Sequence, residues 1–338
     1  MSLIPFGHLA DGTQIDQVTL SGGGLTAKVL TWGAVLQDLR LASHAEPLVL
    51  GLASLEHYTN HSPHMGAMAG RFANRIGGGV FKIAGTHYQL DLNEQDITHL
   101  HGGAAGFGQR PWRLLDHGSD FVTLALFSDA NESGYPGAVN AQVTYRLQDG
   151  GVFAIEASAE TTAPTLVNLA HHSYFNLDGG PDCRNHLIEI DADAFTPLDA
   201  NSVPTGEVDP VQGTPYDLRT LTSIGSGAIT YDINYCLAAM PRRIPDFAAM
   251  VVSPKSGVTM EMWTTEPGVQ FYDASKMRMS VPGLDGKTYG PHAGFCLEAQ
   301  RWPDAPNHRH FPSATLLPGE IYRQVTEYRF SKAGGGAG

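Results

Sequence analysis

Hydrophobic and polar residues alternate along several stretches of this 338-residue chain. The alternation is clear over residues 121–127, 141–147 and 152–157. A period of two residues is typical of a strand with one buried face. Residues 148–151 read Gln-Asp-Gly-Gly, and glycines tolerate the positive φ angles of a hairpin turn. Residues 80–90 form a further strand–turn–strand pattern, so the chain is predicted to be rich in β-hairpins.

Helical patterns are few: residues 54–60 could form one or two turns, and residues 245–250 one more. Strands and helices do not alternate, which argues against Rossmann and TIM-barrel folds, and no repeat of about 20–50 residues indicates a propeller or solenoid. We therefore expect an all-β fold, a large antiparallel β-sandwich with few short helices. It would form a single domain over residues 1–331, and the glycine-rich residues 332–338 would be a flexible tail that cloning could have added.

Composition narrows the class of partner. The chain is 42% hydrophobic and 16% charged, and 21 Lys+Arg against 34 Asp+Glu give a formal net charge of -13 at pH 7. This balance disfavours nucleic acid and membranes as partners and favours a neutral or cationic small molecule. No apolar run could span a bilayer and residues 1–8 do not resemble a secretory signal, so we expect a cytoplasmic location. Cys183, Cys236 and Cys296 are expected to be reduced thiols.

Fifteen histidines are many for this length, and two pairs have the spacing of a metal site. His99 with His101, and His308 with His310, would each place two imidazoles on one face of a strand. Residues 102–108 lack the carboxylate that such a site would add after the first pair. Metal binding is therefore the weaker interpretation, and polar loop histidines are the stronger one for the second pair.

Two adjacent histidines and one carboxylate are better candidates for chemistry. His171 and His172 precede Tyr174 and Phe175. Because neighbouring strand residues point to opposite faces, one histidine could enter a cleft walled by the aromatic rings while the other packs behind it. Two surface histidines beside a turn are an equal alternative. Glu298 lies in an apolar run, where a carboxylate is costly unless paired, so it indicates a site more than a salt-bridged core glutamate.

Other polar residues could contact a ligand rich in hydroxyl groups. Arg71 and Arg75 lie four positions apart, and Asn74 with Arg75 could hydrogen-bond a sugar, although charge at a loop rim is the simpler interpretation. Asp232 could accept hydrogen bonds from vicinal hydroxyls or cap a turn. The sequence contains no GxGxxG after a strand, no phosphate-binding GxxxxGK[ST], no HExxH and no GxSxG.

Five segments, taken in order, resemble the aldose 1-epimerase (galactose mutarotase) family. They are residues 70–76 (GRFANRI), 100–112 (LHGG, GF and W), 168–177 (NLAHHSYFNL), 267–272 (PGVQFY) and 297–322 (LEAQ, PDAPN, FP and LPGEIY). One such motif would be weak, but five in order over nearly the whole chain are specific. The resemblance implies an antiparallel β-sandwich with a sugar cleft on one face. It also implies an enzyme that interconverts the α and β anomers of a free aldose, such as glucose or galactose, without a metal or organic cofactor.

The resemblance further implies that His172 is the general acid and Glu298 the general base. It implies that the sugar is held by Asn74, Arg75, His101, Asp232 and Gln270. Opening a pyranose ring requires removal of the proton on the C1 hydroxyl and protonation of the ring oxygen. A carboxylate and an imidazole, with ordinary pKa values of about 4.3 and 6.5, suit these two tasks. The nearby carboxylate is expected to favour the charged imidazole.

Three departures from the family pattern concern neighbours of these residues. After Tyr272 the chain reads Asp-Ala-Ser-Lys-Met at 273–277, where many members have Thr-Gly-Asn, and this bears on substrate preference near Gln270. His171 stands where many members have Asn, and Ala299 where Thr is frequent.

Three alternatives differ in the groups that they would need. A hexose-6-phosphate 1-epimerase would need a cationic phosphate pocket, and the sequence has no basic cluster. A non-catalytic sugar-binding module would need no acid–base pair. A glycosidase would normally need two carboxylates, and only Glu298 is well placed. The leading expectation is a cofactor-independent isomerase of a small free aldose, acting as a monomer or weak homodimer.

Overall fold

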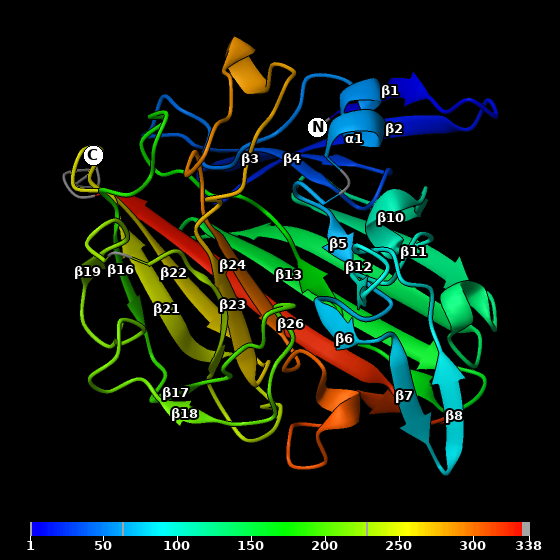
Figure 1. The fold of residues 1–338 in the computed structure, drawn as a ribbon. Coiled ribbons are helices and arrows are strands. Elements are labelled where there is room, and N and C mark those ends of the chain that lie inside the picture. Colours follow the sequence, from blue (N-terminus) through cyan, green and yellow to red (C-terminus); the bar gives the residue numbers. More distant parts are fainter. Residues whose placement is uncertain (1, 63, 228, 333–338) are drawn as a thin grey trace.

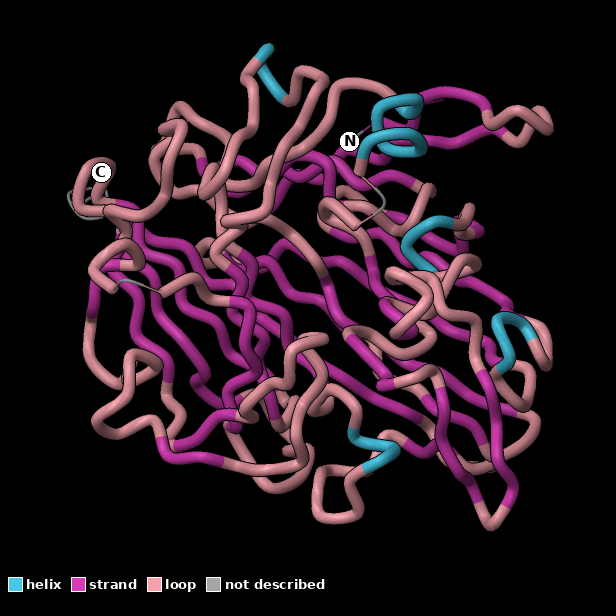
Figure 2. The backbone as a smooth tube through the Cα atoms, in the orientation of Figure 1, coloured by secondary structure: helices cyan, strands magenta, loops and turns pink. Residues whose placement is uncertain are grey.

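The computed structural model describes residues 2–332 except 63 and 228, and strands and loops dominate it (Figures 1 and 2). The α-helix α1 (Leu55–His61) begins after Ser54, whose hydroxyl accepts a hydrogen bond from the backbone N–H of His57 at 3.3 Å. Short 3₁₀ turns make up the other helical segments: η1 (Phe107–Gln109), η2 (Glu132–Gly134), η3 (Leu284–Gly286) and η4 (Ala305–Asn307). Over the described residues, no helix is both long and apolar enough to cross a membrane.

The largest sheet has nine antiparallel strands. In spatial order they are β10 (Arg113–His117), β11 (Phe121–Ser128), β12 (Val139–Gln148), β13 (Val152–Thr161), β26 (Tyr322–Lys332), β22 (Val258–Thr264), β21 (Asp246–Val252), β16 (Leu187–Ile190) and β19 (Thr222–Ser223). Strands β11, β12 and β13 contain the three alternating stretches, and the predicted turn joins the last two. Burial alternates along β12, which gives this part of the sheet one apolar face.

A five-stranded antiparallel sheet packs on the nine-stranded one. Its order is β18 (Asp209–Pro210), β17 (Ala194–Phe195), β20 (Asp232–Cys236), β23 (Gly268–Tyr272) and β24 (Cys296–Gln300). Tyr328 of β26 donates its hydroxyl to Leu297 O of β24 at 2.7 Å, and Gln324 Nε2 donates to Ala299 O at 2.9 Å. Figure 1 shows β23 and β24 lying over β26. The apolar side chains of both sheets share one core, so the expected antiparallel β-sandwich is confirmed.

The remaining strands form smaller sheets around this sandwich. A four-stranded sheet contains β1 (Ser2–His8), β2 (Gln14–Gly22), β3 (Leu25–Leu30) and β4 (Leu36–Leu41). Two-stranded ladders pair β5 (Met68–Ala69) with β15 (Ala170–His171), β6 (Arg75–Gly77) with β9 (Thr98–Leu100), β7 (Val80–Ile83) with β8 (Thr86–Gln89), and β14 (Thr165–Leu166) with β25 (Thr315–Leu316). Strand β26 includes Lys332, the first residue of the predicted tail, and residues 333–338 lie outside the described part of the chain.

One helical prediction is wrong and one is confirmed. Residues 245–250 were expected to form a helical turn, but Asp246 begins β21, which pairs with β22 and β16. A short apolar run is compatible with either a buried strand or a buried helix. Pairing with the neighbouring strands therefore determines its conformation. The pattern at 54–60 is helix α1, and the strand–turn–strand pattern at 80–90 is the β7–β8 hairpin.

Gly23 lies in the β2–β3 turn of the four-stranded sheet, and this turn packs against the β12–β13 turn of the nine-stranded sheet. Gly12, in the β1–β2 turn, serves as the comparison. Gly23 has a φ of 56°, and a Cβ there would lie 1.7 Å from Gln148 O in the β12–β13 turn. Gly12 has a φ of 86° and no atom within 4 Å of its Cβ position. Both alanine variants incur a left-handed backbone, about 1 kcal/mol, but only Gly23→Ala adds a clash, so we expect it to lose about 3 kcal/mol of unfolding free energy. Urea unfolding measures the loss for each variant. Equal losses of unfolding free energy in Gly23→Ala and Gly12→Ala would contradict the packing of the β2–β3 turn on the β12–β13 turn.

Candidate active site

His172 is held by its backbone on the edge of the β5–β15 ladder. Its N–H donates to Ala67 O at 2.9 Å, and its carbonyl accepts from the N–H of Gly66 at 2.9 Å. The neighbouring His171 points the other way, where its Nε2 lies 2.7 Å from Ser173 Oγ and its ring packs on that of Tyr145. The prediction that the two histidines face opposite sides of the backbone is confirmed.

Glu298 faces His172 across the site. Strand β24 carries Glu298 in register with Gln270 of β23, and its Oε1 lies 3.7 Å from His172 Nε2. His172 is 6% exposed and Glu298 is 2% exposed. Among the described residues, Glu298 Oε2 has no hydrogen-bond partner. The imidazole and the carboxylate are therefore both almost inaccessible to solvent, and Oε2 of Glu298 is available to a ligand.

Burial shifts the pKa of both groups. It lowers the pKa of His172 to about 4. It raises the pKa of Glu298 well above its usual range, and the charge of Asp232 adds to this while Arg75 opposes it. The expectation that the carboxylate favours a charged His172 is therefore wrong, because burial disfavours the charged form of each group.

The β6–β9 ladder and the residues next to its strands supply three of the predicted sugar-binding residues. Asn74 donates its backbone N–H to His101 Nδ1 at 3.1 Å, so the neutral His101 must carry its proton on Nε2. The rings of His101 and His172 meet edge to face at 5.2 Å. Arg75 binds Glu94 with two hydrogen bonds, Nε to Oε2 at 2.7 Å and Nη2 to Oε1 at 2.8 Å. This side of the site offers donors at fixed positions.

The five-stranded sheet supplies the other two predicted sugar-binding residues, Asp232 on β20 and Gln270 on β23. Gln270 Nε2 donates to Asp232 Oδ1 at 2.8 Å, and Gln270 Oε1 accepts from Gln300 Nε2 at 3.3 Å. Lys276, from the segment that departs from the family pattern, places Nζ 3.6 Å from Asp232 Oδ2. The seven predicted site residues are thus brought together, since Asp232 and Arg75 also lie close enough to act on the charge of Glu298.

The site contains a residue that the sequence did not reveal. The ring of His64 lies 4.6 Å from that of His101 and is stacked on His172 at 6.0 Å. Burial lowers the pKa of His64 to about 3, and the charge of His172 adds to the effect. No spacing rule marks His64, because its importance comes only from packing.

One of the two aromatic residues predicted to wall the cleft does so. Tyr174 stacks on His172 at 5.1 Å, on the side opposite His64. Phe175 instead turns into the core beside Tyr328.

The histidine pairs considered for metal binding are held by other groups. His99 Nδ1 lies 2.8 Å from Asp91 O, and its Nε2 lies 2.6 Å from the Tyr135 hydroxyl. His308 pairs with Asp304 at 3.1 Å, and His310 Nε2 lies 2.7 Å from a backbone carbonyl.

A different set has metal-like spacing. One ligand atom each from His101, His172 and Glu298 lie within 4.8 Å of one another. However, His101 Nδ1 already accepts the Asn74 N–H, so its Nε2 carries a proton and presents a donor instead of a lone pair. The tautomer of His101 suits a sugar oxygen better than a metal ion.

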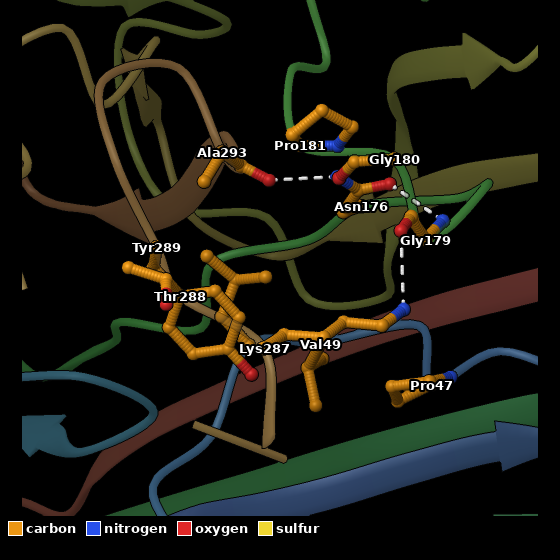
Figure 3. A pocket seen from close by; sticks show the side chains of 11 residues that line it. Pro47, Val49, Asn176, Gly179, Gly180, Pro181, Lys287, Thr288, Tyr289 and Ala293 are labelled. Carbon is orange, nitrogen blue, oxygen red and sulfur yellow. Dashed lines mark hydrogen bonds between the residues drawn. The ribbon is translucent and has the colours of Figure 1, made fainter. Parts of the chain in front are cut away.

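A separate hollow lies beside the loop that follows η3 (Figure 3). Pro47, Val49 and Tyr289 give it apolar walls, and its volume is about 240 Å³. Its central Asn176 donates Nδ2 to the carbonyls of Gly180 and Ala293, as Figure 3 shows for Ala293. Asn176 Oδ1 also accepts two backbone N–H groups. These polar groups bind one another, so the candidate site is the one around the histidine–glutamate pair.

Comparison with known proteins agrees with this geometry. The aldose 1-epimerase family matches residues 16–329 of the chain. Galactose mutarotase of Homo sapiens is 39% identical over 341 residues, 97% of this chain and 98% of the relative. Aldose 1-epimerase of Escherichia coli K12 is 33% identical over 336 residues, 95% of this chain and 96% of the relative.

Solved structures show the same fold. A GalM/aldose epimerase homologue from C. elegans has a TM-score of 0.87 at 29% identity, covering 94% of this chain and 98% of its own. Galactose 1-epimerase from Lactobacillus acidophilus has a TM-score of 0.85 at 24% identity, covering 98% of each chain, and supports the fold alone. Fold and relatives together define a carbohydrate isomerase built on an antiparallel β-sandwich. The chain belongs to the aldose 1-epimerase family.

The buried histidines predict a loss of stability in acid. Burial lowers the pKa of His171 to about 3, so the folded protein does not bind a proton there at pH 5 whereas the unfolded chain does. The free energy of unfolding should therefore fall as the pH drops below about 6.5, by about 2 kcal/mol at pH 5 for this one histidine. We expect His171→Asn to remove that share of the difference between pH 7 and pH 5, measured by urea unfolding.

The matched control is His87→Asn, because His87 is exposed on β8. It should leave the pH dependence unchanged. If His171→Asn and wild type lost the same free energy between pH 7 and pH 5, His171 would have to titrate normally in the folded protein.

Proposed function

We propose that this protein interconverts the α and β anomers of a free neutral aldose, such as glucose or galactose, with His172 as general acid and Glu298 as general base. The observation that supports this most is the 3.7 Å separation of His172 Nε2 and Glu298 Oε1 in a nearly dry space. The C1 hydroxyl and the ring oxygen of a pyranose are bonded to the same carbon. Two groups this close can therefore reach both oxygens at once.

Each proton transfer has a group in place. Glu298 removes the proton of the C1 hydroxyl while His172 Nε2 protonates the ring oxygen, and the bond from C1 to the ring oxygen breaks. The aldehyde rotates about C1–C2, and the ring closes on its other face with the two roles exchanged. Assistance of this kind contributes roughly 10²–10⁴-fold to a rate. Contact with the sugar hydroxyl also favours an ionised Glu298, because the carboxylate then accepts a charge-assisted hydrogen bond.

The surrounding residues orient the sugar. His101 offers an Nε2–H, and Asp232 and Gln270 offer an acceptor and a neutral amide on the opposite side. Arg75, fixed by Glu94, adds a rigid donor. Fixed partners of this kind favour the reactive geometry of the bound ring.

The charges at the site support a neutral sugar over a phosphorylated one. In the described part of the site, Arg75 is paired with Glu94 and Lys276 lies 3.6 Å from Asp232. Each cation is thus already opposed by a carboxylate, and a phosphate would have to displace one. A non-catalytic sugar-binding module would not need a carboxylate buried beside an imidazole, which is a costly arrangement.

Polarimetry on freshly dissolved α-D-glucose and α-D-galactose tests the proposal. We expect wild type to speed the approach to equilibrium rotation, and Glu298→Gln and His172→Asn each to lower kcat at least about 100-fold. The exposed Glu207→Gln and His87→Asn are matched controls that should keep full activity. A wild type inactive on both sugars but active on glucose 6-phosphate would favour the phosphorylated substrate; inactivity on all three would favour the binding module.

A second variant separates sugar binding from proton transfer. Asp232→Ala removes a hydroxyl acceptor but leaves the acid–base pair in place. We expect KM to rise by about tenfold or more and kcat to change less, because one charged hydrogen bond contributes about 1.5–3 kcal/mol. A fall in kcat with an unchanged KM would assign Asp232 to the chemistry instead.

A further inference from the structure

The two ring nitrogens of His172 face two side chains of the same strand. Nε2 lies 3.7 Å from Glu298 Oε1, and Nδ1 lies 3.6 Å from Cys296 Sγ. Residues two apart on a strand share a face, so β24 contacts the imidazole at both of its nitrogens. Cys296 has no role in the proposed reaction, and it is fully buried.

Stacking alone does not define whether Nε2 or Cε1 of His172 faces the proposed sugar position. The ring of His172 lies between Tyr174 at 5.1 Å and His64 at 6.0 Å, and His101 meets it edge to face at 5.2 Å. These contacts fix the plane of the ring. A half-turn about the Cβ–Cγ bond would keep the plane of the ring but place Cδ2 where Nδ1 lies and Cε1 where Nε2 lies. A contact specific to one edge is needed to distinguish the two arrangements.

We propose that Cys296 is the positioning residue that makes this distinction: its sulfur accepts a hydrogen bond from His172 Nδ1–H and leaves Nε2 as the nitrogen that exchanges the proton. The inference rests on the proposed roles of His172 and Glu298. Nδ1–H is present both in the charged ring and in the neutral ring that remains after Nε2 has protonated the sugar oxygen. The same hydrogen bond therefore holds the ring before and after the transfer.

A thiol is suited to this place because it is neutral. A carboxylate bound to Nδ1 would stabilise the charged ring and make His172 a weaker acid. Burial raises the pKa of the Cys296 thiol well above its usual range, with the charges of Glu298 and Asp232 adding to this, while a hydrogen bond from Tyr174 acts against it. The thiol keeps its proton, so it can accept from Nδ1–H, or donate to Nδ1 when the proton is on Nε2.

Three variants at this position separate hydrogen bonding from packing. Cys296→Ala removes the acceptor, Cys296→Ser keeps an acceptor and donor, and Cys296→Val keeps the bulk alone. We expect kcat of the Ala and Val variants to fall roughly 10–100-fold, with KM nearly unchanged and the acidic limb of the pH profile displaced, because a misoriented ring transfers its proton poorly. Cys296→Ser should recover most of kcat. Cys183→Ala, at a fully buried thiol of the core, is the matched control.

The outcomes keep this inference apart from the proposed function. Wild-type kcat and pH profile in Cys296→Ala would overturn it, and so would a serine variant no better than valine, because packing would then account for the loss. If alanine did not fold, by circular dichroism and thermal melting, the serine and valine variants would still decide. Full activity of His172→Asn and Glu298→Gln would overturn the proposed function itself, whatever Cys296 does.

Discussion

The site depends on how Glu298 is carried into an apolar interior beside His172. A carboxylate in such a place is costly, and its position has to be imposed by the surrounding structure. The register of β23 and β24 does this by setting Gln270 opposite Glu298, while Tyr328 of the nine-stranded sheet bonds to the backbone of β24. The sandwich thus supplies a paired strand on which one carboxyl group is kept nearly free of water.

The two sides of the site are built in different ways. Regular pairing of the five-stranded sheet fixes Asp232, Gln270 and Glu298. The histidines come from irregular segments joined by short ladders, where backbone bonds to Ala67 and from Asn74 fix them one at a time. His172 and Glu298, the proposed acid and base, are thus held by separate elements of the fold.

The sequence predicts the fold better than it predicts the site. Alternation over β11, β12 and β13 and the helical pattern at residues 54–60 are local signals, so the sandwich and the helix could be foreseen. The run that forms β21 is ambiguous because burial by neighbours decides its conformation. The approach of His172 to Glu298 joins positions more than a hundred residues apart, which no local pattern encodes, and only family resemblance indicated it. His64 and Cys296 read as an ordinary loop residue and an ordinary core residue, since their importance arises from contacts made after folding.

The proposed exchange of roles between His172 and Glu298 has a consequence for how the catalyst is regenerated. In the proposed reaction the carboxylate gains a proton and the imidazole loses one when the ring opens, and both changes are undone when it closes. The number of protons on His172 and Glu298 is then the same before and after each turnover, whichever anomer entered. Solvent therefore need not deliver or remove a proton before the next molecule binds. A catalyst of the proposed kind therefore needs no exchange of protons with solvent between turnovers, and it brings the two anomers to the same equilibrium from either direction.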